Sequence, residues 1–355
     1  MVVVFFITLR IPVKHFIIFI VAVFSSLIIA FLYRDDGSVV KEGSVLKIYA
    51  SDSFIAKWGP GPQLKEIFEK QTGQKITYIE MTDPVLTFQK MNFDGVAAIG
   101  DVVTSLDQYD LIRSKDKIKW KKLTSSMDSR YTADIKNADA FENFIPYNWA
   151  PIAFVARTDL KIQIKSLDDL FQPELKNKIA LEDPRTSSPG LQFLAWVMMT
   201  KTESDAVQFF KKMNVQAHSY SSGWSAAYGI FTHKQADIVL SYVTSPIYHL
   251  LEEKDSGFKS IEFADGHPAQ IEFAGVPDTC QNCEAAQKFV QFMQTPEAQK
   301  IIMSKNYMLP IYKPAQEATA FDTIKVYKLI SKPLPSKEEL QRWLNLWAEI
   351  RKNEG

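Results

Sequence analysis

The chain has 355 residues, with 41 Lys and Arg against 41 Asp and Glu, five His and two Cys. At about 150 residues per domain this length predicts two domains. The balanced charge argues against a large basic surface, so we expect no nucleic-acid partner. With 46 % hydrophobic and 23 % charged residues, the chain is neither a disordered nor a multi-span membrane protein. The few His and Cys leave little material for a metal site, and we expect no cofactor.

The N-terminal segment differs from the rest of the chain. Residues 16–33 are 18 uncharged residues in a row, and as a helix they would span about 27 Å, the short end for a bilayer. Arg10 and Lys14 precede them and two acids follow, which favours a cytoplasmic N-terminus and an exported body. Residues 1–34 are therefore a signal peptide or a signal anchor. We expect a periplasmic or extracytoplasmic body, tethered by residues 16–33 if the segment is retained.

Beyond residue 44 the sequence alternates strand and helix patterns, which predicts an α/β fold. The expected strands are 46–50, 76–81, 99–105, 154–157, 179–181, 237–242 and 269–276. The expected helices are 63–71, 85–93, 166–171, 191–200, 225–232, 285–294, 297–304 and 337–352. The β-α-β-α-β order at the start predicts a mostly parallel sheet.

Four expected helix starts place a proline beside a small or capping residue: Gly61-Pro62, Asp83-Pro84, Ser188-Pro189 and Ser245-Pro246. Proline is favoured at the first helical position, and three of the residues before it are good N-caps. Each pair alone indicates only a cap. Together they are expected in loops that leave the carboxyl ends of strands, where open α/β sheets bind ligands and helix N-termini face anionic groups.

Aromatic residues gather in the same loops: Trp58, Trp224, Tyr228, Tyr242, Tyr248 and Tyr307. Aromatic faces attract cations, the carboxylate of Asp83 can balance a positive charge, and a helix start can accept a phosphate. This combination favours a flat, cationic heterocycle as the ligand.

Four segments carry a family resemblance: Trp58-Gly-Pro-Gly-Pro62, Asp183-Pro-Arg-Thr-Ser-Ser-Pro-Gly190, Gly223-Trp-Ser-Ala-Ala-Tyr-Gly229 and Leu240-Ser-Tyr-Val-Thr-Ser-Pro-Ile-Tyr-His249. Together and in this order they resemble the thiamine-binding proteins of bacterial ABC importers. The resemblance implies a two-lobed, type II periplasmic-binding-protein fold with the ligand cleft between the lobes. It implies a monomer, not an enzyme, that binds thiamine or a thiamine phosphate and delivers it to an ABC permease in the inner membrane.

The resemblance also implies a set of ligand-binding residues: Asp83, Ser188, Trp224, Tyr242, Thr244, Ser245 and Tyr248. The chain departs from the family pattern at three further cleft positions. Ser51 stands where an aromatic residue is expected, Pro84 where Gly is expected and Tyr307 where Trp is expected. We expect these three residues to line the same cleft.

The implied lobes divide the chain unevenly. Residues 44–148 form the first part of lobe 1, residues 149–268 form lobe 2, and residues 269–312 return to lobe 1. Residues 313–355 form C-terminal helices that we expect to pack on lobe 2.

Cys280-Gln-Asn-Cys283 is the one cysteine motif. An exported body favours a structural disulfide, which would contribute about 2 kcal/mol through loop closure. Free thiols and a redox or metal dithiol at a helix N-terminus remain open.

Two other functions remain open. A same-fold binding protein could take a polyamine, a ferric ion or a phosphonate, although the chain has no Tyr-Tyr pair for iron. A thiamine-degrading enzyme of this fold would need a Cys nucleophile in the cleft.

Overall fold

The computed structural model describes residues 45–81, 100–114, 118–123, 142–311, 320–325 and 327–352. The expected segments 1–34 and 85–93 and the pair Asp83-Pro84 lie outside these residues. Within the described part of the chain, no helix is long and apolar enough to cross a membrane.

The strands form one continuous hydrogen-bonded path in the order β2-β1-β3-β9-β4-β7-β5-β6, and β8 and β10 also pair with β4. The strands are β1 (Leu46–Ser51), β2 (Ile76–Met81), β3 (Val102–Asp107), β4 (Phe144–Arg157), β5 (Ile179–Glu182), β6 (Ser219–Ser221), β7 (Ile238–Tyr242), β8 (Phe258–Ser260), β9 (Ala269–Gly275) and β10 (Leu309–Pro310).

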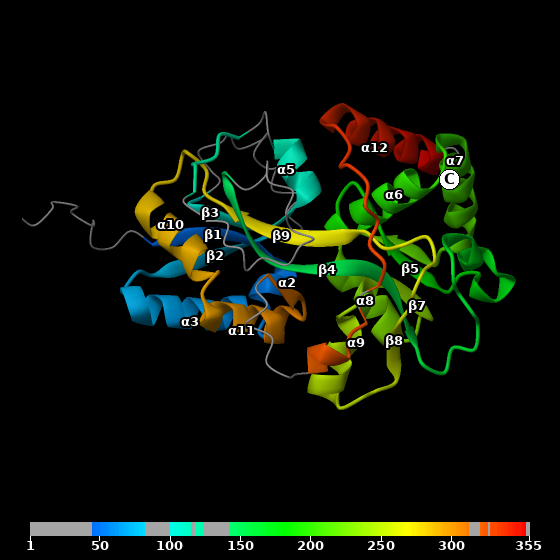
Figure 1. The fold of residues 1–355 in the computed structure, drawn as a ribbon, viewed down its shortest axis with the longest axis horizontal. Helices are drawn as coiled ribbons and strands as arrows, with labels where there is room; N and C mark the ends of the chain where they lie inside the picture. Colours follow the sequence, from blue (N-terminus) through cyan, green and yellow to red (C-terminus); the bar gives the residue numbers. More distant parts are fainter. Residues whose placement is uncertain are drawn as a thin grey trace, which may run out of the picture. The chain divides into compact units, whose positions relative to one another are not determined.

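The sheet is mixed, so the expectation of a mostly parallel sheet was wrong. β1 runs parallel to β2 and β3, and β5 runs parallel to β6 and β7. β9 is antiparallel to both β3 and β4, and β4 is antiparallel to β7, β8 and β10. The antiparallel pairs arise because β4 and β9 run side by side through the middle of the path (Figure 1).

β4 has 14 residues, whereas the sequence predicted a strand only over its last four. Its first part pairs with β9 and its second part with β7. Pro146 and Pro151 in the first part argue against a central strand by themselves, because proline cannot donate to the ladder. The structure accommodates Pro146 beside a register shift against β9.

The α-helices are α2 (Asp52–Ile55), α3 (Gly61–Thr72), α5 (Gln108–Ser114), α6 (Ser188–Thr200), α7 (Glu203–Gln216), α8 (Trp224–Thr232), α9 (Ser245–Tyr248), α10 (Cys283–Phe292), α11 (Pro296–Asn306) and α12 (Lys337–Lys352). Shorter or irregular turns are η4 (Leu167–Phe171), η5 (Pro173–Leu175), η6 (His249–Glu253) and η8 (Ala320–Thr323).

The apolar core separates into clusters that follow the two halves of the strand path. In one cluster, α3, α10 and α11 pack with β1, β2 and β3 through buried residues such as Phe68, Phe289 and Ile302. In another, α6, α7 and α12 pack with β4, β5 and β7. The amphipathic helix α12, whose bounds match the prediction, buries Trp343 and Trp347 against α6 and α7.

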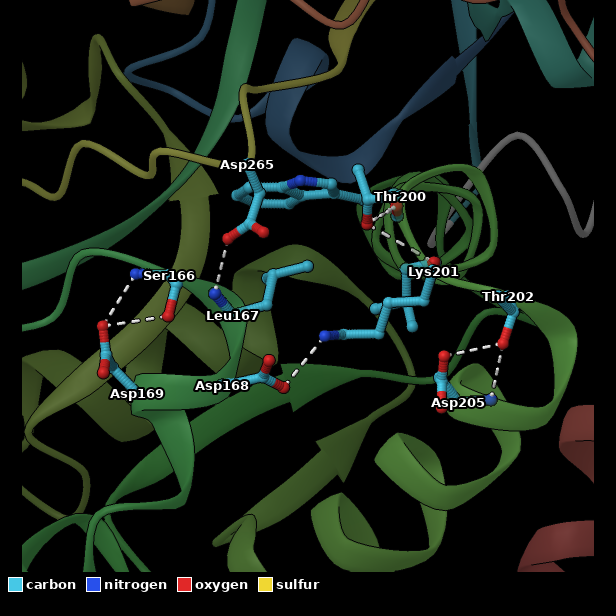
Figure 2. Close-up of polar contacts among 11 residues, drawn as sticks. Ser166, Leu167, Asp168, Asp169, Thr200, Lys201, Thr202, Asp205 and Asp265 are labelled. Atoms are coloured by element: carbon cyan, nitrogen blue, oxygen red, sulfur yellow. Dashed lines mark hydrogen bonds and ion pairs between the residues drawn. The ribbon is translucent and has the colours of Figure 1, made fainter.

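Helix α7 was missed by the sequence analysis, although its start carries a capping signal. Thr202 accepts a hydrogen bond from the Asp205 N–H at its N-cap, and its hydroxyl donates to the Asp205 carboxylate. Figure 2 shows this cap beside Lys201, whose ammonium donates to Asp168 of η4 at 2.9 Å. A Thr followed three residues later by an acid is a known start signature.

The proline-marked helix starts differ by one residue from the expectation. The N-caps of α3, α6 and α9 are Pro60, Ser187 and Thr244, so that each proline is the second helical residue. Both positions tolerate proline, because the first N–H groups of a helix have no partner inside it. α6 and α9 follow strands, whereas α3 follows the short helix α2.

Cys280 and Cys283 form a disulfide in the structure. The carboxylate of Asp101 accepts hydrogen bonds from the N–H groups of Gln281 and Asn282, at 2.7 and 2.8 Å, and from the Lys47 N–H at 3.0 Å. The disulfide loop is thereby fixed to the strand β1.

Candidate functional site

A cavity of about 320 Å³ lies where the carboxyl ends of several strands meet helix starts. Its walls come from the β1–α2 junction, the starts of α6 and α8, α9, the strand β9 and the end of α11. These elements belong to both halves of the strand path, so the crossing strands β4 and β9 bring the walls together.

Seven of the sequence-predicted residues line this cavity: Ser51, Ser188, Trp224, Tyr242, Ser245, Tyr248 and Tyr307. Trp58 and Tyr228, singled out for their loop positions, also line it. Thr244 does not line it, because its side chain is fully buried at the N-cap of α9. Asp83 and Pro84 lie outside the described residues.

Trp224 forms a fixed aromatic wall. Its ring stacks on Tyr228, with centroids 4.7 Å apart and planes 25° from parallel. Its indole N–H donates to the Ser241 hydroxyl at 2.8 Å, and that hydroxyl is 2.7 Å from Ser245 Oγ. Stacking and the hydrogen bond together hold the indole before a ligand arrives.

The stack continues behind Trp224 into the core. Tyr228 stacks on His249, and His249 stacks on Phe258 with centroids 3.6 Å apart. The Tyr228 hydroxyl lies 2.8 Å from His249 Nε2, and His249 Nδ1 lies 2.6 Å from a carboxylate oxygen of Glu253. Burial raises the pKa of Tyr228, so its hydroxyl stays protonated.

A second aromatic pair on the cavity wall comes from the end of α9 and the residue that follows α11. Tyr248 and Tyr307 meet edge to face at 5.3 Å. The Tyr307 hydroxyl donates to Glu252 at 2.7 Å, and Lys305 lies 3.8 Å from the same carboxylate. Burial and Glu252 raise the pKa of Tyr307. The end of α11 is thereby connected to η6.

The charged residues of the described wall are all acidic: Asp52, Glu253 and Glu272. No Lys, Arg or His among the described residues lines the cavity. Asp52 accepts from the Ser53 N–H at 2.6 Å and from the Ser225 hydroxyl at 3.3 Å. Burial raises the pKa of Asp52, and nearby Glu80 adds to this effect. The wall therefore favours a cation.

None of the three acids was predicted as a site residue from the sequence. Glu272 had a usable signal, because it is a lone acid inside the apolar strand β9, between Ile271 and Phe273. Asp52 and Glu253 had none, since each lies in a polar stretch that is typical of solvated surface.

The described residues give no support to metal or thiol chemistry at the cavity. Neither Cys280 nor Cys283 lines it. In the described ranges, no group of three or more His, Cys, Asp or Glu residues is arranged to hold a metal ion.

The α/β halves, the crossing strands and the cavity define a two-lobed periplasmic-binding-protein fold. The chain belongs to the bacterial extracellular solute-binding proteins, whose family model matches residues 46–307. These are solute-binding proteins and not enzymes.

Relatives from several bacteria are named thiamine-binding periplasmic protein. The one from Salmonella typhimurium is 33 % identical over 308 residues, covering 85 % of this chain and 92 % of its own. The one from Escherichia coli is 33 % identical over 312 residues, with the same coverage. The one from Haemophilus influenzae is 31 % identical over 307 residues, covering 85 % and 91 %.

Solved structures agree with the fold. A periplasmic thiamin binding protein matches with a TM-score of 0.79 and 32 % identity, over 87 % of this chain and 98 % of that one. The periplasmic binding protein AfuA from Actinobacillus pleuropneumoniae matches with a TM-score of 0.74 at 18 % identity, over 87 % and 98 %. At that identity the second match concerns the fold alone.

Proposed function

We propose that this protein is the solute-binding component of an ABC importer, and that it binds thiamine or a thiamine phosphate in the cavity. The observation that carries the proposal is a wall of aromatic rings and three carboxylates, without a basic side chain among its described residues. Thiamine consists of two flat rings, a permanently charged thiazolium and an aminopyrimidine, joined by a methylene group. Aromatic faces and carboxylates both favour such a cation. The thiamine-binding names of the relatives support the same ligand.

Within this proposal the residues divide by chemistry. Trp224, Tyr248 and Tyr307 contact the rings, and the starts of α6 and α9 at Ser188 and Ser245 offer hydroxyl and N–H donors to a phosphate or hydroxyl. Tyr242 and Ser51 complete the wall. Asp83 and Pro84 are proposed as ligand contacts on the family pattern alone. Thr244 supports the site indirectly, as the buried N-cap residue that precedes Ser245 in α9.

The proposed ligand cleft lies between two lobes of the type II arrangement. Residues 44–148 and 269–312 make one lobe and residues 149–268 the other. The pairing of β4 first with β9 and then with β7 supports this division. Packing of α12 on α6 and α7 supports a C-terminal segment on the second lobe. A monomer that closes about the hinge strands is the expected state.

We place the body in the periplasm, where it would hand its ligand to an inner-membrane permease. The periplasmic names of the relatives support this location. The Cys280–Cys283 disulfide suits an oxidising compartment. Residues 1–34 are the proposed signal peptide or anchor.

A polyamine is the second candidate ligand, because it is also a cation. A protein titled a putative spermidine/putrescine ABC transporter shares the fold, at 18 % identity and a TM-score of 0.65. A polyamine has no ring to use the fixed Trp224–Tyr228 stack, so thiamine remains preferred. The thiamine-degrading alternative loses its nucleophile, because both cysteines form a disulfide away from the cavity wall.

Native mass spectrometry tests the ligand directly. The full chain is mixed with equal concentrations of thiamine and spermidine and sprayed from a volatile buffer. The expected result is one thiamine adduct per chain, lost in Trp224→Ala. A spermidine adduct, or no thiamine adduct, would contradict the proposal.

A further inference from the structure

The donors that hold the Glu272 carboxylate in the described part of the chain are all neutral. Glu272 lies on β9 opposite Asn148 of β4, whose side-chain amide donates to Glu272 Oε2 at 2.8 Å. The amide of Asn306, at the end of α11, donates to the same oxygen at 3.2 Å. The hydroxyl of Tyr147 is a third donor to this carboxylate.

Among the described residues, no positive group balances the Glu272 carboxylate. In the described part of the chain, no Lys, Arg or His forms an ion pair with Glu272. Burial raises its pKa, and the buried carboxylate of Asp107 raises it further. A charge removed from water is normally paired with an opposite charge, since neutral hydrogen bonds compensate desolvation only in part.

Glu272 lines the cavity, together with Asn306 and Tyr307. A bound ligand can therefore supply the positive charge that the described residues do not place beside Glu272. We propose that Glu272 is the fixed counter-ion for the permanent positive charge of the ligand. This assignment rests on the proposed function and adds to it a residue that sets the charge preference of the site.

The other two wall acids are less suited to this role. Asp52 is the first residue of α2 and accepts the hydroxyl of Ser225 on α8, so its contacts depend on how these two helices approach. Glu253 already bonds His249, and 45 % of its side chain is exposed, where water screens its charge. Glu272 projects from a central strand, between two hydrogen-bonding amides, and so stays in one place.

The test combines a protein change with a ligand change. Glu272→Gln keeps the shape and an acceptor for Asn148 and Asn306 but removes the charge. The ligands are thiamine and an analogue in which a neutral thiophene replaces the thiazolium ring, measured by isothermal titration calorimetry on the full chain. We expect wild type to bind thiamine at least tenfold more tightly than the analogue, and Glu272→Gln to lose most of that preference.

Glu262→Gln is the matched control, because Glu262 pairs with Lys325 outside the cavity wall. It should keep the wild-type preference. Glu272→Asp retains the charge and should retain part of the preference, and thermal melting of each variant checks its folding.

Each outcome decides a separate claim. If Glu272→Gln lowers the affinity for thiamine and for the neutral analogue equally, Glu272 has a structural role and the counter-ion proposal is overturned. Equal affinity of wild type for thiamine and the neutral analogue overturns it without any variant. Failure of wild type to bind thiamine refutes the proposed function itself.

Discussion

Trp58 and Trp224 lie next to each other on the cavity wall, with ring centroids 6.5 Å apart and planes tilted by 58°. Trp58 belongs to the loop between α2 and α3 and is 41 % exposed. Trp224 is the first residue of α8 and is held by Tyr228 and Ser241. One indole is therefore a fixed platform, and the other is partly exposed to solvent beside it.

The fixed platform predicts a strong effect of Trp224. Trp224→Ala should weaken thiamine binding at least tenfold, because it removes the cation–π contact, worth about 0.5–2 kcal/mol, and the packing of the ring. Trp224→Phe keeps a ring and should recover part of the loss. Fluorescence titration measures both. Normal affinity in Trp224→Ala would place the ligand elsewhere.

Thiamine affinity should fall as the pH is lowered from 7 to about 5, because burial raises the pKa of Asp52 and Glu272 above their usual 3.8 and 4.5. Protonation removes the negative charge that attracts the cation. The thiazolium charge does not titrate, and binding should release protons. Calorimetry at both pH values measures the effect, and the Asp52→Asn/Glu272→Gln variant should show a flatter profile.

The same raised pKa values give the folding stability of the ligand-free protein a pH dependence opposite to that of thiamine affinity. A raised pKa means that the folded state binds more protons than the unfolded state, so stability decreases as pH rises between the usual and the raised pKa. Denaturant titrations across this window should show that decrease in wild type and less of it in the double variant. For the binding prediction, a thiamine affinity that rises as the pH is lowered would contradict the proposal that wall carboxylates attract the cation.

The Tyr307–Glu252 hydrogen bond predicts a kinetic effect. Tyr307→Phe keeps the ring against Tyr248 but loses the 2.7 Å bond to η6. A hydrogen bond to a charged group is worth about 1.5–3 kcal/mol, so we expect thiamine to dissociate roughly tenfold faster. Stopped-flow fluorescence measures this rate. The control is Tyr327→Phe, which removes a hydroxyl that bonds Ser260 away from the cavity wall. Thiamine should dissociate from this variant at the wild-type rate.

Substitution of Asp83 can distinguish a helix-capping role from a ligand-binding role. Asp83→Ser should leave the melting temperature unchanged, because serine caps a helix nearly as well as aspartate. If Asp83 contacts the ligand, thiamine affinity falls tenfold or more through loss of a charge-assisted hydrogen bond. Melting and calorimetry on the same variant decide. Unchanged affinity would limit Asp83 to capping.

The sequence predicted the site better than the sheet. Short loop motifs carry Ser188, Trp224 and Ser245 to the cavity, because each begins a helix, and Tyr248 follows as the last residue of the short helix α9. Such local geometry depends on neighbours in the chain, which the sequence displays.

Features that depend on distant pairing were not predictable in this way. β4 contains prolines that disfavour a strand, and its pairing with β9, β7, β8 and β10 keeps it extended. Glu272 became a site residue only once Asn148 and Asn306 were placed around it, although they are 124 and 34 residues away in the chain. Thr244 lies next to the site in sequence, yet burial turns it away from the cavity.

Calorimetric titration of the full-length wild-type chain with thiamine tests the central claim most directly. We expect one site per chain with a dissociation constant of about 1 µM or tighter, which corresponds to a binding free energy of about −8 kcal/mol. Absence of saturable binding at millimolar thiamine, or tighter binding of spermidine under the same conditions, would contradict it.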